Sequence, residues 1–135
     1  MKIPFQSDAL GKLILRLTLG SFILFHGIAK VMNPVRTLDS MSERLVAAGL
    51  PSYVAFGVFV GEVLAPILII LGIYSRIGGL LVVINMIFAV LLAHTAQLFL
   101  LTKTGGWALE LQGFYLFTGL ALFFLGSGKL ALKPD

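Results

Sequence analysis

The sequence predicts an all-α fold, a four-transmembrane-helix bundle with a short amphipathic interfacial helix between spans 1 and 2. The chain is 59% hydrophobic and only 12% charged, whereas a soluble domain has roughly 25% charged residues. It contains four apolar runs, each close to the roughly 20 residues that a helix needs to cross the hydrocarbon core. Because these runs are continuous, they exclude the alternating strands of a transmembrane barrel.

The four runs predict spans at approximately 9–32, 53–74, 77–100 and 107–125. They leave no room for a second domain in 135 residues, so residues 1–135 are expected to form a single integral membrane domain. The first run is longer than the apolar core of a signal peptide and Arg16 interrupts it, so we expect it to be retained. Ser7 or Asp8 is a suitable cap for the first helix.

The longest connection predicts a short helix over approximately 34–48. Asn33 followed by Pro34 is a typical helix start, because proline suits the first helical position. Gly49 and Pro51 form a typical stop. Apolar residues recur between them at helical spacing, namely Leu38, Met41, Leu45 and Ala48. This helix is interpreted either as a surface connector or as a cover over a polar cavity.

Packing signals concentrate in the second span. Gly57 and Gly61 are four residues apart, which predicts close approach of another helix. Pro66 lacks a backbone donor one turn after Glu62, so we expect a kink or a free carbonyl there. The turn at residues 74–76 is so short that the second and third spans should be antiparallel.

Ionisable side chains inside the apolar runs mark the candidate site, because charges within a bilayer are costly. Counting about 1.5 Å per residue places Lys30, His94 and Glu110 in one outer layer, with His26 and Glu62 beneath it. We expect this group to bind a small ligand or to handle protons. For each residue the alternative is structural: an ion pair, an interhelical hydrogen bond or a snorkelling lysine.

Other polar residues are expected to stand apart from this group. Arg16 is interpreted as a snorkelling anchor or as a partner for the inner ends of other helices, and Arg76 as a further anchoring residue. Asn85 lies about 180° from His94 on an ideal helix, so it is expected to bridge helices elsewhere.

The net charge of +4 indicates membrane headgroups and not nucleic acid, because the basic residues are scattered over the connections. With four spans, both termini share one side of the membrane. That side carries Lys2, Lys12, Arg76, Lys129 and Lys133. The opposite side has fewer basic residues and also holds Asp39 and Glu43. This bias predicts cytoplasmic termini in a bacterial inner membrane.

The known catalytic motifs are absent. The two histidines and the two intramembrane glutamates lack Glu-x-x-His and HExxH spacing, so no metal is expected. There is no cysteine, so any redox role must rest on a bound cofactor or a partner. Tyr115 and Trp107 in the fourth span could line a pocket for a quinone-like ring, or they could face lipid.

Several short segments follow one another in a distinctive order: Gly27-Ile28-Ala29-Lys30 before Pro34, Ala48-Gly49-Leu50-Pro51, Glu62, Ser75-Arg76, Glu110 and Gly126-Ser127-Gly128. Over nearly the whole chain this order resembles the DoxX family of small four-helix membrane proteins. The resemblance implies membership of a group that includes the small subunit of a thiosulfate:quinone oxidoreductase and proteins of membrane complexes that handle oxidative or thiol stress. It carries over Lys30, Glu62, Arg76 and Glu110, with Arg16 less directly, and transfers no catalytic role.

The leading hypothesis is a membrane subunit of a redox system whose polar cluster binds a small ligand, such as a quinone. It implies a soluble or membrane redox partner and leaves open whether the chain is itself catalytic. A second hypothesis is permeation or transport of a small solute or proton, with a homodimer formed through Gly57 and Gly61. A third is a passive membrane anchor for a soluble enzyme.

Overall fold

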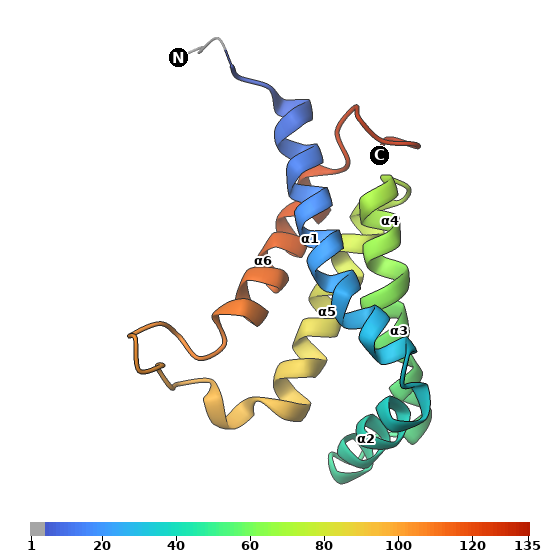
Figure 1. Cartoon of the computed structure of the whole chain (residues 1–135), viewed down its shortest axis with the longest axis vertical. Helices are drawn as coiled ribbons and strands as arrows, with labels where there is room; N and C mark the ends of the chain where they lie inside the picture. Colours follow the sequence, from blue (N-terminus) through green and yellow to red (C-terminus); the bar gives the residue numbers. More distant parts are fainter. Residues whose placement is uncertain (1–4) are drawn as a thin grey trace.

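Five helical segments make up the computed structural model, which describes residues 5–135 (Figure 1). They are α1 (Asp8–Val31), α2 (Pro34–Ala47), a continuous helical segment over Ser52–Leu71, α5 (Ser75–Ala93) and α6 (Glu110–Leu125). The described residues are therefore all-α, as predicted. Lys2, which contributed to the prediction of topology, lies outside them.

Three of these segments are long and apolar enough to cross a membrane: α1, Ser52–Leu71 and α5. Helix α6 is also apolar, but its 16 residues make it shorter than these three segments. Phe5 and Asp135, the first and last described residues, lie toward the same end of the molecule (Figure 1). We call this the inner end and the opposite end, which carries α2, the outer end.

The helices around the connection between α5 and α6 are shorter than the apolar runs that predict them. Helix α5 ends at Ala93, where His94 adopts a φ of −132° and leaves the helix. A 3-10 turn follows over Thr95–Gln97. The loop beyond it folds back on itself, since the Trp107 indole N–H donates to the Leu98 carbonyl at 2.8 Å. These local hydrogen bonds replace the helical ones expected up to residue 100 and from residue 107.

Both predicted helix starts occur. The Ser7 hydroxyl accepts a hydrogen bond from the Leu10 N–H at 3.2 Å, which caps α1. Helix α2 begins at Pro34 after Asn33, although the Asn33 side chain makes no capping bond. In α2, Leu45 is the buried residue and faces the bundle.

The core lies between α1, α4 (Ala65–Leu71), α5 and α6. Its helices approach closely at glycines. A Cβ atom on Gly119 would meet the Gly79 carbonyl, so α5 and α6 contact through their backbones. Gly61 packs directly on Asn85, as its spacing predicts. Gly57 instead faces open space, since a Cβ atom there would meet nothing within 4 Å.

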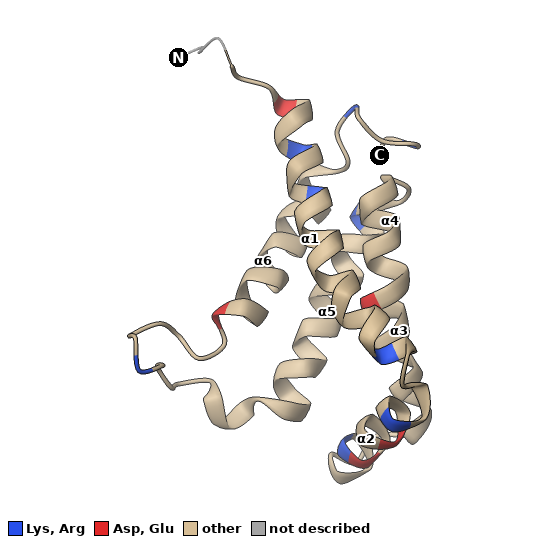
Figure 2. Cartoon of the chain, viewed as in Figure 1, with Lys and Arg blue, Asp and Glu red and all other residues tan. Residues whose placement is uncertain are grey.

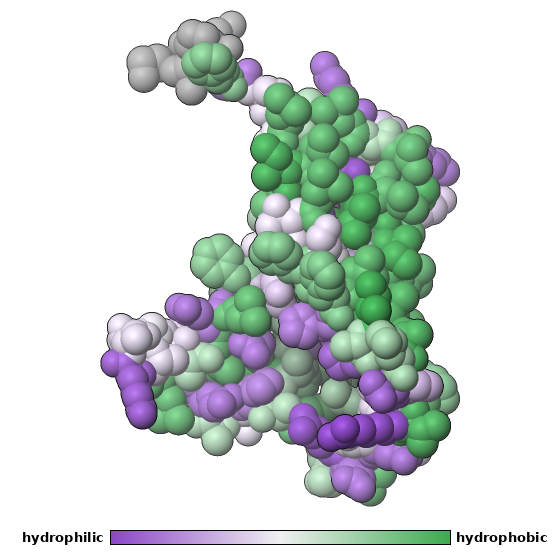
Figure 3. Space-filling view, in the orientation of Figure 1, coloured by the Kyte–Doolittle hydropathy of each residue, from purple (hydrophilic) through white to green (hydrophobic). Residues whose placement is uncertain are grey.

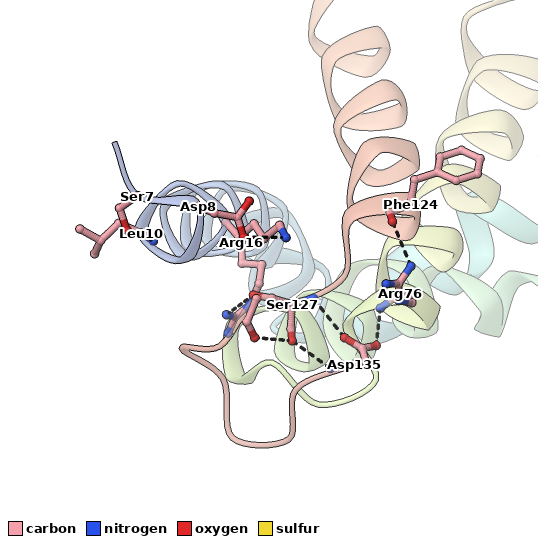
Figure 4. Close-up of polar contacts among 10 residues, drawn as sticks. Ser7, Asp8, Leu10, Arg16, Arg76, Phe124, Ser127 and Asp135 are labelled. Carbon is pink, nitrogen blue, oxygen red and sulfur yellow. Dashed lines mark hydrogen bonds and ion pairs between the residues drawn. The ribbon is translucent and has the colours of Figure 1, made fainter. Parts of the chain in front are cut away.

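The segment after α6 closes the inner end of the bundle (Figure 4). The Asp135 carboxylate accepts hydrogen bonds from the Ser75 hydroxyl, from the Arg76 N–H at 3.0 Å and from the Ser127 N–H at 3.1 Å. Ser75 and Arg76 are the first residues of α5. A carboxylate at this position satisfies free N–H groups and opposes the positive end of the helix dipole.

Acid should weaken this closure. Burial alone would raise the pKa of Asp135, but hydrogen bonds from Arg76, Ser75 and Ser127 outweigh it and hold the pKa below its ordinary value. The stabilisation is present above the ordinary pKa of about 3.9 and is lost as pH falls through the lowered folded-state pKa. Because Asp135 is exposed, we expect Asp135→Asn to reduce stability at neutral pH by less than about 1 kcal/mol. Thermal unfolding in detergent should show a smaller loss on acidification for the variant than for the wild type. Identical pH profiles would contradict this role.

Candidate functional site

The helix that carries Glu62 changes its winding around this residue. The segment Ser52–Leu71 passes from a 3-10 turn (η1, Ser52–Phe56) through a short α-helix (α3, Gly57–Phe59) into a π-helical turn (η2, Val60–Leu64), and then continues as α4. Pro66 has no N–H to donate to the Glu62 carbonyl four residues earlier. π-Helical turns within α-helices occur frequently at functional sites.

Glu62 is buried, with 8% of its surface exposed, and both of its carboxylate oxygens are hydrogen-bonded. Lys30 Nζ of α1 donates to Oε1 at 2.6 Å, and Asn85 Nδ2 of α5 donates to Oε2 at 3.3 Å. Three helical segments thus meet at one carboxylate. Figure 2 shows that charged positions are sparse along the middle of the helices and gather in α2 and toward the opposite end of the molecule.

The ion pair and Asn85 lie on the wall of a cavity of about 460 Å³. Every long helical segment contributes to its lining, and α2 contributes Met41, Arg44 and Leu45. The polar lining residues are His26, Lys30, Arg44, Glu62, Asn85, His94, Gln112 and Tyr115. The remaining wall is mostly apolar and includes Ile23, Val58, Leu81, Ile84, Met86, Phe88, Leu92 and Leu111.

The cavity brings together four of the five predicted site residues. His26 lies on α1 with its ring edge against Tyr115 of α6, the ring centroids 6.3 Å apart. His94, just beyond α5, has Nδ1 2.7 Å from Gln97 Oε1. Together with Lys30 of α1 and Glu62 of the helix of residues 52–71, these two histidines line the same cavity.

Glu110 is placed differently from this group. It is the first residue of α6, is exposed and does not line the cavity. The two glycines of the predicted packing pair, Gly57 and Gly61, both lie on the cavity wall. Among the described residues, no group of three or more acidic or histidine side chains is arranged to hold a metal ion.

Arg16 and Arg76 lie at the inner end, away from the cavity. Arg16 is 1% exposed and is therefore not a snorkelling side chain. Its guanidinium donates to the carbonyls of Ile69 and Ile70 at the end of α4, and Figure 4 shows it beside Ser127. Arg76 donates to the carbonyls of Phe123 and Phe124 near the end of α6. Each arginine thus caps the C-terminus of another helix, where free carbonyls and the helix dipole favour a cation.

The prediction that Asn85 stands apart is wrong. The prediction used the angle between Asn85 and His94 around an ideal helix, but the helix ends at Ala93 and does not include His94. The informative neighbour is Gly61, which leaves room for Asn85 next to Glu62. Tyr115 lines the cavity, which was one of its two expected placements, whereas Trp107 does not. Arg44 and Gln112 also line the cavity without having been singled out as site residues. A sequence signal exists for Arg44 alone, since it directly precedes the apolar Leu45 of the amphipathic helix.

The geometry suits a small molecule with a polar end. Ligand sites are typically cavities of about 300–1,000 Å³ with mostly apolar walls and a few placed polar groups. The apolar lining can hold a ring, while ammonium, amide, phenol and imidazole groups can bind its oxygens.

The DoxX family model matches residues 11–95, which is more than half of the chain. This chain belongs to the DoxX family. The matched region contains Lys30, Glu62, Asn85 and His94 and ends before Glu110. Family membership and the apolar helices together identify a membrane protein, for which the bilayer is the surrounding medium.

One curated relative of this DoxX protein is a Bacillus subtilis (strain 168) protein named "Putative oxidoreductase CatD". The two are 29% identical over 129 residues, which cover 96% of this chain and 89% of the relative. No solved structure gives a significant match.

Proposed function

We propose that this DoxX-family protein is a membrane subunit of a redox system and that its cavity binds a quinone-like ring. In this proposal it crosses a bacterial inner membrane four times, with α2 at the outer interface and both termini in the cytoplasm. The cavity between the helices, with a partly buried Lys30–Glu62 pair on its mostly apolar wall, is the observation that carries the proposal.

The polar groups have distinct roles in this function. Lys30 or His94 donates a hydrogen bond to a ring carbonyl, and Glu62 takes part in proton movement when the ring is reduced or oxidised. A carboxylate that faces both an ammonium and a ligand can accept a proton without leaving its hydrogen bonds. His26 and Tyr115 lie at the side of the ring.

Two further observations support a redox subunit. The printed name of the Bacillus subtilis relative describes an oxidoreductase. The chain has no cysteine, so in this proposal electrons reach the ring from a bound cofactor or from a partner protein. In this view the chain is a non-catalytic subunit, and Glu110 on the exposed start of α6 is available to a partner.

Quinone binding is tested by purifying the protein from native membranes and analysing the extracted lipids. We expect a co-purified quinone and a quinone-induced rise in the unfolding temperature. The absence of both would overturn the proposal. Solute flux above that of empty vesicles after reconstitution would then favour transport, and the absence of flux would favour a passive anchor.

A matched set of variants locates the site. We expect Lys30→Met to weaken quinone binding roughly tenfold or more, because a charged donor to a buried oxygen is lost. Lys103→Met is the control, since Lys103 lies in the exposed loop at the same end. Binding is measured by the thermal shift as a function of quinone concentration.

A single change that leaves Glu62 unpaired in the interior can also impair folding. The double variant Lys30→Met/Glu62→Gln removes both charges and should fold normally by circular dichroism, yet still bind quinone weakly. Glu110→Gln is its control for the carboxylate. Unchanged binding by the folded double variant would place the quinone elsewhere.

A further inference from the structure

The two sides of α2 differ in charge. Arg44 lies on the side that lines the cavity, together with Met41 and Leu45. Arg36, Asp39 and Glu43 instead line a separate depression, with Asn33 and Ser40. The space-filling view shows this hydrophilic surface at the outer end of the molecule (Figure 3). The acidic residues of α2 thus line the separate depression, together with Arg36, whereas Arg44 lines the cavity.

The charges that line the cavity do not balance. Lys30 is paired with Glu62 at 2.6 Å, and Asn85 binds the second carboxylate oxygen. Arg44 lines the cavity, is also exposed to solvent, and has no carboxylate within 4.0 Å among residues 5–135. The lysine, arginine and glutamate side chains of the lining therefore sum to one positive charge.

A ligand anion would complete this arrangement. The guanidinium is planar and can bind an oxyanion through two parallel N–H donors, which is geometrically more selective than an ammonium. Because Arg44 is exposed, water solvates its guanidinium when the cavity is empty or holds a neutral ring, and an anionic ring oxygen would take the place of that water. The cavity volume, about 460 Å³, lies in the range of small-molecule sites.

We propose that the ligand of this cavity is an acidic ring compound of the quinone type, ionised at neutral pH, and that Arg44 binds its charged oxygen. Arg44 then determines specificity for the charged oxygen. The Lys30–Glu62 pair binds the opposite side of the ring. The inference rests on the proposed function, since it specifies the class of ring. An anionic lipid headgroup offers the same charge chemistry and is distinguished by the test.

The experiment compares two probes on the detergent-purified full chain. One is a hydroxynaphthoquinone whose enol is ionised at neutral pH, and the other is its neutral O-methyl ether. We expect the wild type to bind the anion roughly tenfold more tightly than the ether, and Arg44→Gln to abolish this preference. Arg36→Gln is the control, because it removes an equal charge from the same helix but from outside the cavity.

The outcomes separate this inference from the proposed function. If neither probe binds, both are overturned. If both probes bind equally to the wild type and to Arg44→Gln, the acidic ligand is excluded while a quinone site stands. An equal loss of anion binding in Arg44→Gln and Arg36→Gln would contradict the inference by showing an effect of net charge alone. Displacement of the anion by phosphatidylglycerol but not by phosphatidylcholine would overturn it in favour of a lipid headgroup.

Discussion

Replacing Arg16 by methionine is expected to lower the free energy of unfolding in detergent by about 3 kcal/mol or more. The Arg16 guanidinium donates to four carbonyl oxygens, those of Ile69, Ile70, Ser127 and Leu130, at 2.7–3.0 Å. Methionine fills much of the same volume but leaves these oxygens without their donor in a buried place. Unfolding is followed by circular dichroism as a function of denaturing detergent.

Two further variants make this result specific. Lys12→Met removes a basic residue one turn earlier in α1, where Lys12 pairs with Asp8 at 2.9 Å. Because Asp8 is largely exposed, this change should cost less than about 1 kcal/mol. Arg16→Lys should recover only part of the stability, since one ammonium group cannot reach carbonyls on both sides of a guanidinium. Equal unfolding free energies for Arg16→Met and Lys12→Met would refute the anchoring role of Arg16.

Gly27→Ala is expected to have an effect of comparable size, about 3 kcal/mol. A Cβ atom on Gly27 would collide with the Glu62 carbonyl oxygen of the π-helical turn. That obstacle is backbone, so no side-chain rotation can relieve it. The whole helix of residues 52–71 must move away from α1, which also separates Glu62 from Lys30. We therefore expect quinone binding to be lost together with stability, as measured by unfolding and by the quinone-induced thermal shift.

The controls for Gly27→Ala are other glycine-to-alanine changes. Gly11 lies in the same helix and Gly57 in the opposing one, and both face open space. Alanine at either position should be neutral or stabilising by up to about 1 kcal/mol, because it favours the helical backbone. If Gly27→Ala were as stable as Gly11→Ala, the close contact of α1 with the π-helical turn would be disproved.

The features that follow from composition and helix geometry could be predicted from the sequence. Apolar runs define the helices, because only a helix satisfies its backbone in an apolar medium. The rise per residue is fixed, so counting along two helices places Lys30 in an outer layer and Glu62 beneath it, which left an ion pair between them as one of the alternatives. The structure pairs these two side chains.

Rotational position was less predictable than depth. A π-helical turn or an early helix end shifts the direction of every later side chain, and neither has a clear signal in the sequence. Asn85 is therefore directed at Glu62, contrary to expectation. The position of Glu110 was predicted by counting residues from 107, as if the helix began there. Helix α6 instead begins at Glu110, so the exposed position of this residue was missed.

The residues after α6 were the least predictable part. They contain no periodic pattern, and their conformation depends on distant side chains such as Arg16 and Ser75. Positive φ values at Gly126 and Gly128 allow the chain to turn back over the bundle. Long-range hydrogen bonds of this kind leave no trace in local sequence.

The contacts of Arg16 also determine when the protein can finish folding during synthesis. Arg16 is made early, yet it binds the carbonyl of Ser127, 111 positions later in the chain. Helices can enter the membrane one after another before they associate. The guanidinium can therefore bind the carbonyls of Ile69 and Ile70 first, and part of it lacks its carbonyl partners until the last segment emerges from the ribosome. The position of Arg16 near the membrane surface keeps it within reach of water during that interval. Closure of the inner end is thus the final step of assembly, and a chain that stops before Ser127 cannot complete it.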